Sequence, residues 1–122
     1  MSEGFDVLLR HVDEIAPVAT SHGVGIKRVI ATQDQVGKLV TQIARTLLLK
    51  GEAVEEHVHP TMDEHFFFLE GECHVAVAGK CHLCEAGDYL FIPASNEHSI
   101  KVISNTVMIT IGIEQCSKNI SE

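Results

Sequence analysis

Alternating hydrophobic and polar positions run through the second half of the chain. The clearest segment, 72–78, is followed by a turn at 79–80 and a returning segment. Side chains of a strand point to alternate faces, so this period of two predicts a half-buried hairpin. Segments 89–92 and 107–113 have the apolar and β-branched content of further strands. Short strands separated by glycine turns predict an all-β barrel or sandwich.

The first half of the chain is less clearly patterned. Residues 26–30 are rich in β-branched side chains and predict a strand. Segment 39–50 fits a strand, but its leucines also suit a helix, and residues 4–16 could form a short amphipathic helix or an edge strand. We therefore divide the chain into an N-terminal appendage (1–23), a barrel (24–116) and a C-terminal tail (117–122).

Composition narrows the function classes. The 122 residues suffice for one domain, and 45% of them are hydrophobic, which predicts a globular core. The formal charge of −8 and the scattered Lys and Arg residues argue against nucleic acid as a partner. The sequence shows neither a leader pattern nor a run of about twenty apolar residues, so we expect a cytoplasmic protein without a membrane partner.

The four cysteines are expected to be reduced, because a chain of this size can build an ordinary core without disulfides. The Cys81-His-Leu-Cys84 segment has C-x2-C spacing. On a strand, however, thiols three residues apart point to opposite faces, so we interpret the segment as an ordinary strand of the hairpin. Four histidines lack partner spacing and are expected to be surface or hydrogen-bonded residues: His11, His22, His74 and His82.

Two histidines and a carboxylate come together in segment 51–71. His57 and His59 are two residues apart, so on a strand their imidazoles point the same way and can share one small cation. Pro60 ends the regular pairing, and the turn that follows returns Glu64 beside the histidines. The pattern indicates a metal site; the alternatives are a polar network without metal or surface residues of a hairpin.

The flanking glycines make this pattern more specific. Segment 51–71 is G-x5-H-x-H-x4-E-x6-G, and Gly87, Pro93 and His98 follow it. The two segments resemble the two motifs of the cupin superfamily, although Ser95 stands where glycine is usual and Val102 where asparagine is usual. The resemblance implies a double-stranded β-helix (a jelly-roll-like cupin barrel), a homodimer, and a metal held by His57, His59, Glu64 and His98.

Three nitrogen ligands and one oxygen ligand suit a borderline divalent metal such as Fe, Mn, Ni, Co or Zn. One or two coordination positions would remain for water or substrate, so the ion could polarise a substrate oxygen. The pattern does not distinguish among these metals.

Neighbouring residues complete the expected pocket. Phe66 and Phe68 share the parity of Glu64 and should face the same cavity, either as walls of a small-molecule pocket or as ordinary core. Arg45 is either an anion-binding group in the pocket or a rim residue with its charge in water. His65 follows Glu64 directly and should therefore point away from the cavity.

Two function classes fit these residues. The first is a metal-dependent enzyme of isomerase, dioxygenase or lyase type that acts on a small polar metabolite, with the metal binding substrate oxygen. The sequence reveals no general acid or base for it. The second is a protein that binds or senses a small molecule at the metal without turnover.

Overall fold

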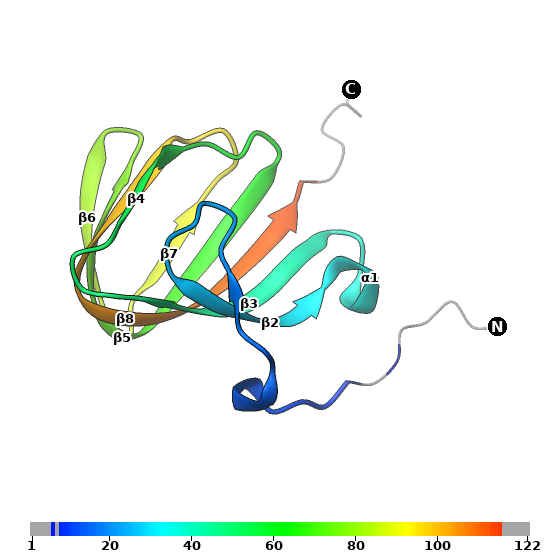
Figure 1. Cartoon of the computed structure of the whole chain (residues 1–122). Coiled ribbons are helices and arrows are strands. Elements are labelled where there is room, and N and C mark those ends of the chain that lie inside the picture. Colours follow the sequence, from blue (N-terminus) through cyan, green and yellow to red (C-terminus); the bar gives the residue numbers. More distant parts are fainter. Residues whose placement is uncertain (1–5, 7, 116–122) are drawn as a thin grey trace, which may run out of the picture.

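The computed structural model describes residue 6 and residues 8–115 (Figure 1). The 3-10 helix η1 and the helix α1 are short, at Val12–Glu14 and Gln33–Val36. The strands are β1 Val18–Ala19, β2 Ile26–Thr32, β3 Val40–Leu48, β4 Ala53–His57, β5 Met62–Val77, β6 Lys80–Glu85, β7 Tyr89–Ile92 and β8 His98–Glu114. Within the described residues, no helix has the length and apolar content needed to cross a membrane.

The strands form one antiparallel sheet that folds back on itself. Its main path is β1-β2-β3-β8-β5-β6, with β4 on β8 and β7 on β5. The long strands β5 and β8 pair with each other and divide their outer edges: β5 pairs first with β7 and then with β6, while β8 pairs first with β4 and then with β3. Their curvature is visible in Figure 1. The all-β barrel prediction is confirmed, and segment 39–50 supplies a strand.

Gly71 lies where β5 changes its pairing. The register of β5 on β8 shifts between Phe68 and Cys73, and Gly71 has a φ of +90°. A Cβ at this position would lie 2.2 Å from the Asn105 carbonyl oxygen and 2.6 Å from the Cα of Thr106. Any side chain would therefore clash with the backbone of β8 as well as adopt a strained φ.

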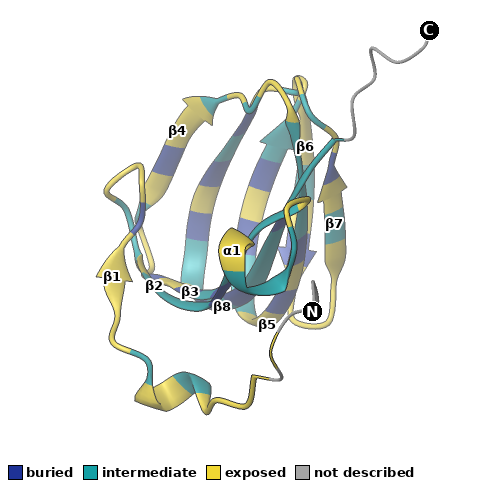
Figure 2. Cartoon of the chain, turned by 90° about the vertical axis from the view of Figure 1, so that its right-hand side faces the viewer, coloured by how far each residue is buried: buried dark blue, intermediate teal, exposed yellow. Residues whose placement is uncertain are grey.

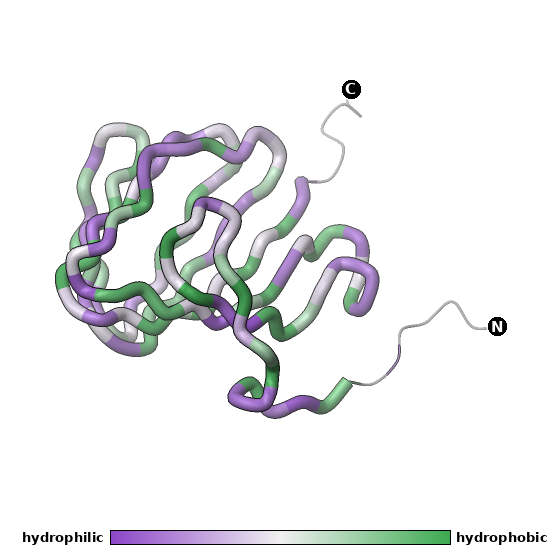
Figure 3. Tube along the Cα trace, viewed as in Figure 1, coloured by the Kyte–Doolittle hydropathy of each residue, from purple (hydrophilic) through white to green (hydrophobic). Residues whose placement is uncertain are grey.

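The core lies between the two long strands and their partners. Buried residues alternate with intermediate or exposed ones along parts of β3 and β8 (Figure 2), and hydropathy varies in a similar way along the chain (Figure 3). The core cluster consists of Leu48, Val54, Phe66, Phe68, Cys73, Val75, Cys84, Ile92, Ile100, Val102 and Met108.

The N-terminal segment contains a 3-10 turn within residues 4–16 and a short strand after them. The 3-10 turn η1 is followed by β1, which pairs with the edge of β2. Before the turn, Arg10 Nη1 donates to the Ile30 carbonyl oxygen at 2.8 Å. The segment is thus tied to the outer edge of the sheet. The predicted tail, 117–122, lies outside the described residues.

Several large apolar side chains are exposed on the outer face of β5, β6 and β7. Phe67, Leu83, Tyr89 and Phe91 are all more than two fifths exposed. These exposed side chains do not by themselves test the expected homodimer, which stays a prediction.

The two cysteines of the C-x2-C segment lie on opposite faces of β6. Cys84 is buried in the core, whereas Cys81 is exposed. Burial, reinforced by the nearby Asp88 carboxylate, raises the pKa of the Cys84 thiol to about 11. At about pH 8, the Cys84 thiol would therefore be almost entirely un-ionised.

This difference predicts selective thiol labelling. With Cys116, which lies outside the described residues, replaced by serine, an aromatic disulfide reagent should label Cys81 rapidly. It should label Cys73 and Cys84 only after unfolding, because both are buried. The measurement is the released chromophore over time, with Cys81→Ser and Cys84→Ser as matched controls. Rapid labelling that persists in Cys81→Ser would contradict the expectation.

Candidate metal centre

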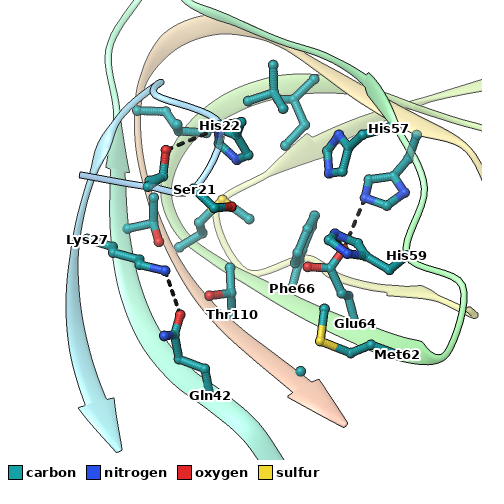
Figure 4. A pocket seen from close by; sticks show the side chains of 18 of the residues that line it. Ser21, His22, Lys27, Gln42, His57, His59, Met62, Glu64, Phe66 and Thr110 are labelled. Carbon is teal, nitrogen blue, oxygen red and sulfur yellow. Dashed lines mark hydrogen bonds and ion pairs between the residues drawn. The ribbon is translucent and has the colours of Figure 1, made fainter. Parts of the chain in front are cut away.

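The four predicted ligands come from different parts of the barrel. His57 ends β4, His59 lies in the loop after it, Glu64 is in β5 and His98 begins β8. Each offers one nitrogen or oxygen atom, and these four atoms lie within 4.8 Å of one another. Figure 4 shows His57, His59 and Glu64 directed into one side of a cavity. The structure thus brings together every residue of the predicted set.

Backbone carbonyls orient two of the imidazoles. His57 Nδ1 lies 2.9 Å from the Glu55 carbonyl oxygen, and His98 Nδ1 lies 2.9 Å from the Asn96 carbonyl oxygen. A carbonyl only accepts, so each Nδ1 carries the hydrogen and donates it. In the neutral rings, Nε2 is left with its lone pair, which is the arrangement that metal-ligating histidines use.

Two buried polar atoms at the centre of the cluster lack a well-formed hydrogen bond. Glu64 Oε1 and His98 Nε2 lie 3.0 Å apart, but the geometry between them does not satisfy either atom. His59 Nε2 lies 3.5 Å from the same Glu64 oxygen. An unsatisfied buried polar atom costs about 1–3 kcal/mol. A divalent cation among these atoms would satisfy them, so the residues present fit a metal.

The electrostatics of the cluster favour cation binding. Burial would raise the pKa of Glu64, but the neighbouring His98 and His59 outweigh it and hold the pKa below its usual value. Burial lowers the pKa of His59. Burial also acts to lower the pKa of His98, but Glu64 and the Asn96 carbonyl outweigh it and raise that pKa. The carboxylate is therefore ionised near neutral pH and carries the negative charge that a cation requires.

The loop before β8 is hydrogen-bonded to the loop that carries His59. The Ser95 backbone N–H donates to the His59 carbonyl oxygen at 2.7 Å, and Ser95 Oγ donates to the Pro60 carbonyl oxygen at 3.1 Å. Ala94 N donates to Asp63 Oδ1 at 2.8 Å. Ser95 has a φ of +72°, a conformation that glycine adopts most easily. This explains why glycine is usual at its position in the motif that the sequence resembles.

A cavity of about 310 Å³ opens beside the four ligands. Its apolar wall belongs to the core and includes Leu48, Val54, Phe66, Ile100 and Met108. Its polar wall includes Thr20, Ser21, His22, Lys27, Gln42, Thr46 and Thr110. This volume is at the lower end of the range for small-molecule sites.

Two of the residues proposed for the pocket do not line it, as the alternative interpretation of each allowed. Phe66 lines the cavity, but Phe68 is fully buried and packs edge-on against Phe66, with ring centroids 6.3 Å apart. Arg45 lies on the outer face of β3, because Ala44 and Thr46 on either side of it point inward. Its Nη2 atom pairs with Asp13 Oδ1 at 2.5 Å, and this hydrogen bond lowers the pKa of Asp13.

The expectation for His65 is confirmed. Its Nδ1 lies 2.6 Å from the Tyr89 hydroxyl, and its ring stacks on Tyr89, outside the cavity.

His22 is exposed and hydrogen-bonded, as expected, but sequence reasoning missed that it also lines the cavity. Its ring centroid lies 5.7 Å from that of His57. The Thr20 hydroxyl gives its single hydrogen to the Val24 carbonyl, so His22 Nδ1 must donate to Thr20 Oγ1, 3.1 Å away. Nε2 is then unprotonated. Burial and His57 both lower the pKa of His22, which keeps the ring neutral.

No local signal in the sequence identifies His22, because it lies in a turn with no ligand spacing. Only the return of the segment between β1 and β2 over the barrel places it there. The segment expected to be an appendage thus contributes Thr20, Ser21 and His22 to the cavity.

Fold and site together define a small β-barrel protein with a candidate metal centre beside a cavity. Residues 44–113 match the cupin domain family, so the chain belongs to the cupin family.

One relative and two solved structures show what the chain is similar to. The chain is 32% identical over 88 residues to the tetracenomycin polyketide synthase protein TcmJ of Streptomyces glaucescens; the match covers 71% of this chain and 59% of that protein. Among solved structures, a predicted oxalate decarboxylase from Thermotoga maritima matches with a TM-score of 0.80 and 22% identity, over 88% of this chain and 100% of that one. An RmlC-like cupin from Shewanella frigidimarina matches with a TM-score of 0.73 and 18% identity, over 98% and 97%. At these identities the structural matches show the fold alone.

Proposed function

We propose that this cupin is a metal-dependent enzyme of isomerase, dioxygenase or lyase type that acts on a small polar metabolite. Its ligands would be His57, His59, Glu64 and His98, and its metal Fe, Mn, Ni, Co or Zn. The observation that carries the proposal is the pair of buried atoms, Glu64 Oε1 and His98 Nε2, that lack satisfying hydrogen bonds beside a cavity. When bound, a divalent ion supplies a Lewis acid for a substrate oxygen.

Residues of the chain would handle the substrate around that centre. Phe66 and Met108 give the cavity an apolar wall that limits water. His22 is the candidate proton acceptor, because its Nδ1 is committed to Thr20 and its Nε2 is left unprotonated in a ring that lines the cavity.

A second candidate function is the binding or sensing of a small molecule without turnover. Among the described residues that line the cavity, only His22 and Lys27 are titratable in addition to the four ligands. A site with so few proton-transfer groups favours this alternative.

The test begins with elemental analysis of protein reconstituted with each metal. Less than about a tenth of an equivalent would contradict both functions. The loaded protein is then assayed with aldoses, oxo-acids and catechols. For the enzyme, we expect turnover that falls by about a hundred-fold or more in His22→Gln, with metal content unchanged. His65→Gln is the matched control and should retain full turnover. Ligand retention without turnover would support the binding protein instead.

A further inference from the structure

Charge is unbalanced at the cavity wall opposite the metal ligands. Among the described residues that line the cavity, Glu64 is the one carboxylate and Lys27 the one ammonium group. Lys27 forms no ion pair with any described residue. Its positive charge also contributes to lowering the pKa of His22. The wall that carries Lys27 is therefore an unneutralised positive surface in a protein whose overall charge is −8.

A neighbouring amide holds the Lys27 ammonium in place. Lys27 Nζ donates to Gln42 Oε1 at 2.7 Å, and both side chains line the cavity. The amide nitrogen of Gln42 remains as a further donor. Together the two residues offer N–H groups of the kind that bind a carboxylate or another small oxyanion.

Strand register separates this donor pair from the metal ligands. Gln42 in β3 is paired with Gly112 in β8, and Gly112 is paired on its other edge with Glu64 in β5. Neighbouring strands lie about 4.8 Å apart, so the backbones of Gln42 and Glu64 are about 10 Å apart. Figure 4 shows Lys27 and Gln42 across the cavity from His57, His59 and Glu64. The side chains reach inward from both sides, so a small molecule can span the gap.

We infer that the cavity takes a small dianion, such as a dicarboxylate, with one anionic end at the metal centre and the other at Lys27 and Gln42. The inference rests on the proposed metal centre. A divalent cation, the Glu64 carboxylate and the Lys27 ammonium leave two positive charges, which a dianion neutralises. The small cavity and its apolar wall fit a short carbon chain between the two anionic groups.

The test measures binding, not turnover. Zinc-loaded protein is titrated calorimetrically with malonate, succinate, glutarate and adipate, and with butyrate as a probe that carries a single carboxylate. At least one dicarboxylate should bind about ten-fold or more tightly than butyrate, the size expected for hydrogen bonds to a charged group. Lys27→Met should abolish this preference without changing zinc stoichiometry, and Lys27→Arg should retain it. Lys101→Met removes a lysine that does not line the cavity and is the matched control.

The outcomes distinguish failure of the proposed metal centre from failure of the anion site at Lys27. If wild-type protein binds no zinc, the proposed metal centre fails and the inference falls with it. If zinc binds but no dicarboxylate is preferred, or if the preference survives in Lys27→Met, the anion site is overturned and the metal centre stands. If Lys27→Met fails to load zinc, Gln42→Leu provides a second test. An undiminished preference for a dicarboxylate over butyrate in Gln42→Leu would also overturn the anion site.

Discussion

Alanine at His59 is expected to lower the affinity of the protein for Zn²⁺ by about a hundred-fold or more, because it removes one of three nitrogen ligands. The His59 side chain is about one third exposed, whereas His98 is almost completely buried. Loss of metal in His59→Ala therefore reports on coordination with little disturbance of packing. Competition with a chromophoric chelator measures the affinity, and elemental analysis gives the stoichiometry.

The control is His65→Ala, which removes an imidazole next to Glu64 that points out of the cavity. Its zinc affinity should equal that of the wild type. Affinity should also rise with pH, because imidazoles must lose their protons to bind metal. The raised pKa of His98 extends this rise to higher pH than an ordinary histidine would. Equal zinc affinity in His59→Ala and wild type would contradict the assigned ligand set.

Replacing Gly71 by alanine is expected to destabilise the metal-free protein by about 3 kcal/mol or more. Gly71 and Gly51 both have φ near +90°, so alanine is strained at either position. A Cβ at Gly71 would also meet the backbone of Asn105 and Thr106, whereas a Cβ at Gly51 meets nothing within 4 Å. Gly51→Ala should therefore cost only about 1–2 kcal/mol.

Urea unfolding of the two variants measures this difference. Because the two glycines share nearly the same φ, the excess cost of Gly71→Ala isolates the close approach of β5 and β8. Equal midpoints and slopes for the two variants would show that the strands move apart at little cost, contrary to the expectation.

Strand parity and motif spacing predicted the ligand cluster from the sequence. His57 and His59 share a face because they are two residues apart, and Glu64 returns to them through a turn at Pro60. Parity also placed His65 outside the cavity. Parity was insufficient for Phe68, which continues on the face of Phe66 but lies deeper in the barrel, where the cavity no longer reaches.

The all-β fold, the family and the residues of the candidate metal centre could be predicted from the sequence alone, because alternation and ligand spacing are local properties of one or two strands. By contrast, the fold as a whole turns Arg45 outward to Asp13 and brings His22 and Lys27 to the cavity. Their positions depend on the register across β2, β3, β8 and β5 and on the return of the N-terminal segment over the barrel. No local pattern carries that information. The positively charged wall opposite the candidate metal ligands is therefore a property of the assembled barrel.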